Sequence, residues 1–129
     1  MIKRTNAPAL SQPPGYSHVV VASGRRLVTT AGAVPLDAEG DLVGAGDLHA
    51  QARQTLENLA LALEAVGATE RDVIRMTVYV VAGERADLSA VWVAVQQSGI
   101  AGAASTLLGV SMLAIEGQLV EIEAIAVLE

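Results

Sequence analysis

The stretch LVEIEAIAVL (Leu119–Leu128) is a strand-like run in which eight of ten residues are apolar and two are acids. Successive side chains of a β-strand point to opposite faces, so Glu121 and Glu123 must lie on the same face. On that face Leu119 and Ile125 flank them. A face that is both acidic and apolar suits neither an ordinary core nor full exposure to solvent. What packs against this face therefore bears on how the fold is assembled.

The rest of the chain predicts strands that alternate with helices, in the order β-β-α-β-α-β-β. HVVVASGRRLVTTAGAV (18–34) is rich in β-branched residues on both sides of Ser23-Gly24, which is typical of a hairpin. DVIRMTVYVV (72–81) alternates apolar and mixed positions, so it predicts a strand with one dry face. STLLGVSML (105–113) predicts a further strand, separated from the last one by a Glu116-Gly117 turn.

Two helices are expected between these strands. Asp47 is a candidate N-cap because its carboxylate can accept the free backbone N–H groups of a first helical turn. From there to Gly67, apolar residues recur at three- and four-residue steps and form one stripe: Leu48, Ala52, Leu56, Leu59, Leu63 and Val66. Asp87 is expected to cap a second, shorter helix that ends at Ser98-Gly99.

Helices that each carry a single apolar stripe belong on one face of a sheet, which makes the expected fold α+β with a mixed β-sheet and two helices on one face. The chain has no third helix to cover the other face. Hydrophobic residues make up 52% of the sequence, and such a fraction on a small chain favours burial between subunits. We therefore expect the face of Glu121 and Glu123 to look into a joint between copies of the chain.

Composition narrows the function classes. The 129 residues suit a single domain spanning 1–129, and the net charge of −6 with no basic run longer than Arg25-Arg26 argues against nucleic-acid binding. The absence of cysteine excludes thiolate catalysis, and His18 and His49 lack the spacing of a metal site, so neither a metal nor a cofactor is expected. No segment predicts a membrane span or a signal peptide, and a cytoplasmic protein is expected.

Several motifs together carry a resemblance to a known family. They are NAP at 6–8, GY at 15–16, DLHAQARQTLENLALALEAVGA at 47–68, DVIRMTVYV at 72–80 and LVEIEAIAV at 119–127. In this order and over nearly the whole chain, they resemble the RidA family, also called YjgF/YER057c/UK114. The resemblance implies a chorismate-mutase-like α+β fold assembled as a homotrimer, with small-molecule ligands or substrates bound in clefts between subunits.

The best-known members of that family are enamine/imine deaminases, which hydrolyse 2-iminoacids to 2-ketoacids and ammonia without a metal or cofactor. By resemblance, Glu121 matches the glutamate that orients the attacking water, which makes it the candidate catalytic residue, and Tyr16 matches a tyrosine that lines the cleft. Ala31-Gly32-Ala33 stands where the deaminases carry Ser-Gly-Gln, and Trp92 where they carry an asparagine. The candidate ligand-binding residues are therefore Tyr16, Ala31, Gly32, Trp92, Ser105 and Glu121.

Ser105 is the main departure from the family pattern, because the deaminases carry there the arginine that grips the substrate carboxylate. A guanidinium binds a carboxylate through two charge-assisted hydrogen bonds, and the loss of a buried one costs on the order of several kcal/mol. Iminoacid hydrolysis by the family's route is thus not expected. Glu121 without that cation favours a neutral or cationic ligand. A nucleophilic Ser105 would need a histidine base, and nothing ties it to His18 or His49.

Three functions stay open. The first is an arginine-lacking homotrimer whose clefts bind a small metabolite or carry out a variant hydrolytic reaction centred on Glu121. The second is an imine deaminase that takes its arginine from elsewhere, such as Arg75 or Arg26. The third is a non-catalytic ligand-sensing or protein-binding trimer. In simpler interpretations, Glu121 pairs with Arg75, and Gln51 on the first helix faces water or a neighbour.

Overall fold

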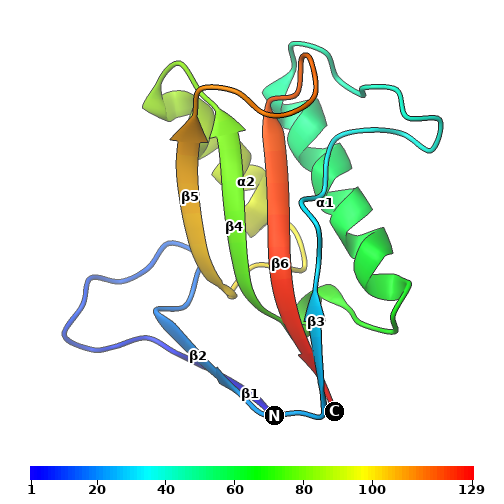
Figure 1. Ribbon diagram of the computed structural model, residues 1–129. Helices are drawn as coiled ribbons and strands as arrows, with labels where there is room; N and C mark the ends of the chain where they lie inside the picture. Colours follow the sequence, from blue (N-terminus) through cyan, green and yellow to red (C-terminus); the bar gives the residue numbers. More distant parts are fainter.

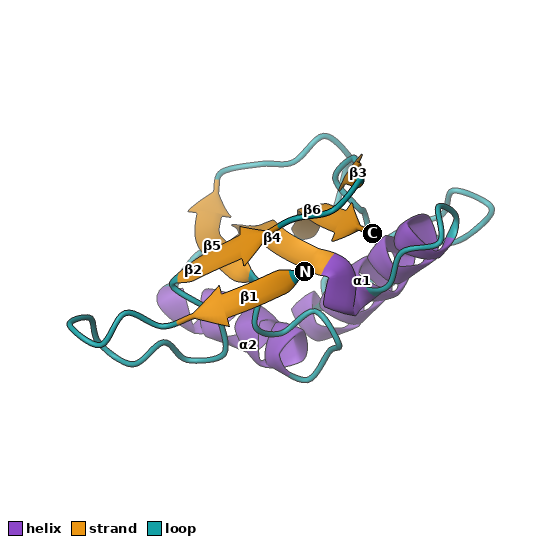
Figure 2. Ribbon diagram, turned by 90° about the horizontal axis from the view of Figure 1, so that it is seen from below, coloured by secondary structure: helices purple, strands orange, loops and turns teal.

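The computed structural model describes residues 1–129 and contains a four-stranded mixed sheet, a separate two-stranded sheet and two helices (Figure 1). The elements in chain order are β1 (Ile2–Thr5), β2 (Val19–Ala22), β3 (Arg26–Thr29), α1 (Leu48–Glu64), the 3-10 turn η1 (Glu70–Asp72), β4 (Val73–Val81), α2 (Arg85–Gln96), β5 (Ala104–Val110) and β6 (Val120–Leu128). The large sheet has the order β3-β6-β4-β5, with β4 and β5 parallel and the other pairs antiparallel. Both helices lie on one side of this sheet, which confirms the expected fold class (Figure 2).

The expected hairpin around Ser23-Gly24 is wrong. β2 pairs with β1 in the small sheet, whereas β3 pairs with β6 in the large one. Between them the backbone crosses the end of β6, where Arg25 N donates to Leu128 O at 3.0 Å. A β-carbon at Gly24 would lie 2.5 Å from that same oxygen, so the close crossing needs a glycine. β3 instead pairs with the end of β6, from Ile125 to Leu128.

The last two strands are also separated rather than paired with each other. β5 follows α2 and lies parallel to β4, and the segment after it then crosses to the other side of β4. β6 therefore sits in the middle of the sheet, between β3 and β4 (Figure 1). This places Glu121 and Glu123 at the centre of the sheet rather than at an edge.

α1 forms as expected from its sequence. Asp47 Oδ1 accepts a hydrogen bond from Ala50 N at 3.0 Å, and the apolar stripe is buried up to Leu63. Val66, however, lies beyond the helix end and is half exposed. Gly67 has a φ of 78°, which is the left-handed conformation that glycine favours after a helix.

The prediction that Asp87 caps α2 is wrong, because the helix begins three residues earlier. Glu84 is the N-cap, and Asp87 lies inside the helix at the third position. Asp87 Oδ2 instead accepts hydrogen bonds from the backbone N of Gly83 at 3.0 Å and of Glu84 at 3.3 Å. Two acids three residues apart thus form a reciprocal capping box, which starts the helix earlier than a single capping acid does.

The hydrophobic core lies between the helices and the sheet and has nineteen buried apolar residues in one cluster. Alternate residues of β4 and β6 enter this core, and the others point to the opposite side. We call this opposite side the open face. Its side chains are Leu27 and Thr29 on β3, Arg75, Thr77 and Tyr79 on β4, Thr106 and Leu108 on β5, and Glu121, Glu123, Ile125 and Val127 on β6.

None of the helices combines the length and the hydropathy that a membrane span requires.

Candidate functional site

Glu121 projects from the centre of β6 onto the open face, opposite Tyr79 of β4. Its Oε1 accepts a hydrogen bond from Gln118 Nε2 at 3.1 Å. The segment after β3 passes directly beneath the carboxylate, where Ala33 and Ile122 form a β-bridge. A β-carbon at Gly32 would lie 2.6 Å from Glu121 Cδ, so a larger residue here would displace the Glu121 carboxylate from its observed position. The structure therefore brings Gly32 and Glu121 together, with Ala31 exposed beside them.

Gln118 is a functional candidate that sequence reasoning missed. Its side chain is almost completely buried, and its Nε2 donates to Val120 O at 3.0 Å as well as to Glu121. Its Oε1 accepts from Ile115 N at 3.3 Å. These contacts fix the amide, and the amide fixes the carboxylate of Glu121. A single glutamine between a turn and a strand carries no pattern that would have indicated this role.

Glu123 is held differently from Glu121, although both lie on the open face. The hydroxyl of Tyr79 donates to Glu123 Oε1 at 2.6 Å. This hydrogen bond is the main reason that the pKa of Tyr79 lies above the usual tyrosine value, with burial and the charges of Glu123 and Glu121 acting in the same direction. Glu123 thus belongs to a structural pair with a neutral partner.

We expect Tyr79 to ionise at a higher pH than an ordinary tyrosine. The folded chain holds the Tyr79 proton more tightly than the unfolded chain does. The corresponding stability is therefore complete below about pH 10, the unfolded value, and is lost as the pH rises through the folded pKa. An ultraviolet titration should show a phenolate transition above the ordinary tyrosine value, and Glu123→Gln should move that transition back toward the ordinary value. A Tyr79 transition at the ordinary tyrosine value in the unmodified chain would contradict this assignment.

Three other candidate residues meet at a different place, on the helix side of the sheet beside the edge strand β5. Tyr16, Trp92 and Ser105 line a cavity of about 160 Å³ together with Pro14 and Leu107. The rings of Tyr16 and Trp92 meet edge to face, with 6.3 Å between their centroids. Trp92 is half buried and also packs against the core, so it combines a packing role with a place in the cavity wall.

The loop that carries Tyr16 is anchored at both of its ends. The backbone N of His18 donates to Asn6 Oδ1 at 3.2 Å, and Ala7 N donates to His18 Nδ1 at 3.0 Å. The hydroxyl of Ser17 donates to Gly102 O at 2.6 Å, just before β5. His18 therefore has a structural partner, and the NAP motif positions the aromatic wall. The chain has no group of three or more His, Asp or Glu side chains arranged to hold a metal ion.

The candidate residues therefore form two half-sites on opposite faces of the sheet. Ser105 is in register with Met76, whose side chain is fully buried under the helices, whereas Glu121 is in register with Tyr79 on the open face. Within one chain, the side chains of Ser105 and Glu121 are separated by the sheet. A single ligand can contact both half-sites only if they come from different copies of the chain.

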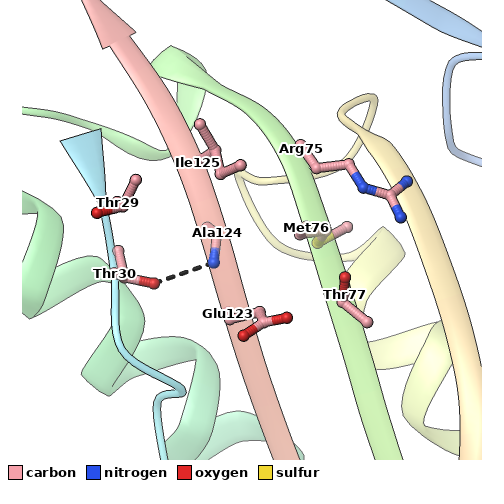
Figure 3. A pocket seen from close by; sticks show the side chains of 8 residues that line it. All are labelled: Thr29, Thr30, Arg75, Met76, Thr77, Glu123, Ala124 and Ile125. Carbon is pink, nitrogen blue, oxygen red and sulfur yellow. Dashed lines mark hydrogen bonds between the residues drawn. The ribbon is translucent and has the colours of Figure 1, made fainter. Parts of the chain in front are cut away.

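Neither alternative arginine lies beside Glu121. Arg75 shares the open face and lines a cavity of about 310 Å³ with Thr29, Thr30, Thr77 and Glu123 among others (Figure 3). Its guanidinium donates to Thr106 Oγ1 at 2.7 Å. On β4, Arg75 is in register with Ile125, which lies about 13 Å along β6 from Glu121 at the usual rise of a strand. Arg26 is in register with Leu128, which points to the helix side. The pairing of Glu121 with Arg75 is therefore not observed.

Comparison with known proteins places the chain in a family. The sequence model described as Endoribonuclease L-PSP matches residues 5–128. YyfB from Yersinia pestis, a protein of unknown function of the conserved Rid family, has a solved structure that is 38% identical, with a TM-score of 0.88 over 98% of both chains. The chain belongs to the Rid (YjgF/YER057c/UK114) family. This confirms the family resemblance seen in the sequence motifs.

Two further relatives act on or bind small amino-acid-like compounds, by their descriptions. The 2-iminobutanoate/2-iminopropanoate deaminase of Salmonella typhimurium is 38% identical over 79 residues, which cover 61% of this chain and 58% of that protein. E. coli TdcF, solved with bound serine, is 27% identical, with a TM-score of 0.70 over 100% of this chain and 98% of the other. The chain spans about half the length of the curated relatives that it matches.

Proposed function

We propose that this Rid protein is a homotrimer that binds a small metabolite in clefts between its subunits and hydrolyses an imine there, with Glu121 orienting the water. The single observation that carries the proposal is the placement of Glu121 on the open face, held by Gln118 and seated on Gly32. A carboxylate fixed in this way can accept a proton from a water molecule at a defined position. A surface acid with no function needs neither the hydrogen bond from a buried glutamine nor the space left by a glycine.

The open face supports assembly. Leu27 is 70% exposed, and Ile125 and Val127 lie only partly covered on the same face. A second copy would cover these side chains and would bring one subunit's Glu121 toward another subunit's Tyr16–Trp92 cavity. The two half-sites would then form one cleft. In this arrangement the homotrimer implied by the family resemblance completes the site.

The reaction needs no metal or cofactor to balance. Water adds through its oxygen to the carbon of a protonated imine, R₂C=NH₂⁺, while Glu121 takes one of its protons. The carbon–nitrogen bond then breaks as Glu121 passes that proton to nitrogen and the hydroxyl proton of the addition product goes to the departing ammonia, which leaves R₂C=O and NH₄⁺. Glu121 acts first as base and then as acid, and it ends in its starting state.

The substrate is expected to differ from that of the iminoacid deaminases. The hydroxyl of Ser105 donates to Ala103 O at 2.8 Å, so even this small donor is already engaged within the chain. Glu121 has no guanidinium within reach in its own subunit. A neutral or cationic imine with no carboxylate on its reacting carbon suits this site better than a 2-iminoacid.

A non-catalytic ligand-binding trimer is the second candidate, and the same cavity favours it. The Trp92 indole N–H donates to Pro14 O at 2.8 Å, so the indole N–H and the Ser105 hydroxyl in the cavity wall both have partners within the chain. Such a wall binds apolar groups without taking part in chemistry. The endoribonuclease named by the family description is a weaker candidate, since a net charge of −6 does not suit a phosphate backbone.

Hydrolysis of imines generated in situ separates these functions. Imines would be released from amino acids by an amino-acid oxidase and from primary amines by an amine oxidase, and semicarbazide would trap those that escape hydrolysis. The proposal expects the protein to lower semicarbazone formation from amine-derived imines more than from 2-iminoacids. Equal rates with and without the protein for both classes would reject catalysis and leave the binding function. Light scattering after size exclusion tests the trimer.

A further inference from the structure

The Tyr16–Trp92 cavity continues along the surface of α2 as a second hollow. This hollow, of about 350 Å³, shares Pro14, Trp92 and Leu107 with the inner cavity. Its remaining lining comes from one face of the helix: Arg85, Leu88, Ser89, Val93 and Gln96. Most of these residues recur at three- and four-residue steps, so they stand in a row beside Trp92. We call the two hollows together the α2 groove.

The walls of the inner end of the α2 groove are almost entirely apolar. The Trp92 N–H and the Ser105 hydroxyl both donate to backbone carbonyls, and the remaining walls are Leu107, Pro14 and the ring of Tyr16. An apolar or aromatic group can enter here without stripping water from an unpaired donor. A charged group would lose its hydration and gain no partner. The inner end therefore accepts only the apolar part of a ligand.

The outer end of the groove carries one cation. Arg85 is exposed at the first turn of α2, and its guanidinium makes no hydrogen bond or ion pair with the rest of the chain. The nearby acids do not neutralise it by direct pairing, because Glu84 and Asp87 are engaged in capping the helix. The hydroxyl of Ser89 donates back to Arg85 O, and Gln96 Nε2 donates to Pro14 O at 3.3 Å. Arg85 is thus the free charge of the groove.

Charge and shape together define a ligand class. Arg85 precedes Trp92 by seven residues, which is about 10 Å along the helix axis. A flexible arginine side chain spans much of that distance, and a guanidinium binds a carboxylate with two parallel hydrogen bonds. We propose that the α2 groove binds a carboxylate anion with an apolar ring or branched chain, with the apolar part against Trp92 and the carboxylate on Arg85. The carboxylate is then bound by α2 and not at position 105 on β5.

Tryptophan fluorescence tests this site directly, because Trp92 is the only tryptophan in the chain. The probes are 4-phenylbutanoate and its neutral amide, 4-phenylbutanamide, which share the ring and the chain and differ in charge. We expect the carboxylate to change the fluorescence with at least about tenfold higher affinity than the amide, at low salt. Arg85→Gln should lower the affinity for the carboxylate to that for the amide and leave the amide unchanged. The matched control is Arg25→Gln, an exposed arginine at the β2–β3 connection.

Several results would overturn the proposed site on the α2 groove. Equal affinities of the two probes, no response to either, or an equal loss with Arg25→Gln would each overturn the site. A carboxylate preference that survives Arg85→Gln would place the anion elsewhere and would also overturn it. Binding is measured here without imine hydrolysis, so a failure of this inference leaves the proposed catalytic role of Glu121 to its own test.

Discussion

Glu121→Gln should lower the rate of imine hydrolysis by about 10²- to 10⁴-fold, which is the usual contribution of a positioned general base. The replacement keeps the shape of the side chain, and its amide oxygen can still accept the hydrogen bond from Gln118 that Glu121 Oε1 accepts at 3.1 Å. The variant therefore loses the proton acceptor without losing the support. Steady-state rates with amine-derived imines, measured by ammonia release, check this result.

Glu123→Gln is the matched control for that experiment. Glu123 lies on the same open face, two residues along the same strand, and carries the same charge. Its carboxylate accepts the hydroxyl of Tyr79, so its replacement should change the titration of Tyr79 and leave hydrolysis nearly unchanged. Full activity in Glu121→Gln, or an equal loss in both variants, would contradict the assignment of the base.

Strand alternation and the cap of α1 were readable from the sequence because both depend on neighbours in the chain. The alternation in 119–128 correctly placed Glu121 and Glu123 on one face, and Asp47 correctly marked the start of α1. Pairing between strands was harder to predict. The Ser23-Gly24 connection has the composition of a hairpin turn, yet β3 pairs with a strand about one hundred residues away. Local sequence does not report which distant edge is free.

The site was predictable to a similar degree. The motifs led to Tyr16, Trp92, Ser105 and Glu121, but alternation alone could not place them on one or the other face of the sheet without the register. The structure shows that they form two groups, because Ser105 is paired with Met76 and Glu121 with Tyr79. Gln118 was not predicted, since its role depends on a hydrogen bond from its side-chain amide to the carboxylate of Glu121, which no sequence pattern indicates.

Gln51→Leu should lower the free energy of unfolding by about 2 kcal/mol or more, since two backbone groups lose their partners and unpaired buried polar groups cost about 1–3 kcal/mol each. The expectation that Gln51 on α1 faces water or a neighbour is wrong, because the side chain is fully buried. Its Nε2 donates to Gly44 O at 3.1 Å and to Gly117 O at 3.0 Å, and its Oε1 accepts from Leu119 N at 2.7 Å. A leucine fits the volume but leaves Gly117 O and Leu119 N without partners, whereas Gly44 O keeps the hydrogen bond from Asp47 N at 2.9 Å. Urea unfolding followed by circular dichroism measures the loss.

Gln97→Leu is the control, because Gln97 is exposed at the end of α2 and should change stability by less than about 0.5 kcal/mol. The two backbone groups at Gly117 and Leu119 flank Gln118, which holds the carboxylate of Glu121. Gln51→Leu should therefore also lower hydrolysis under conditions where the chain is still folded. An unchanged unfolding midpoint would show that this carbonyl and this N–H find water instead. A destabilised variant with full activity would show that Gln118 holds Glu121 without support from α1.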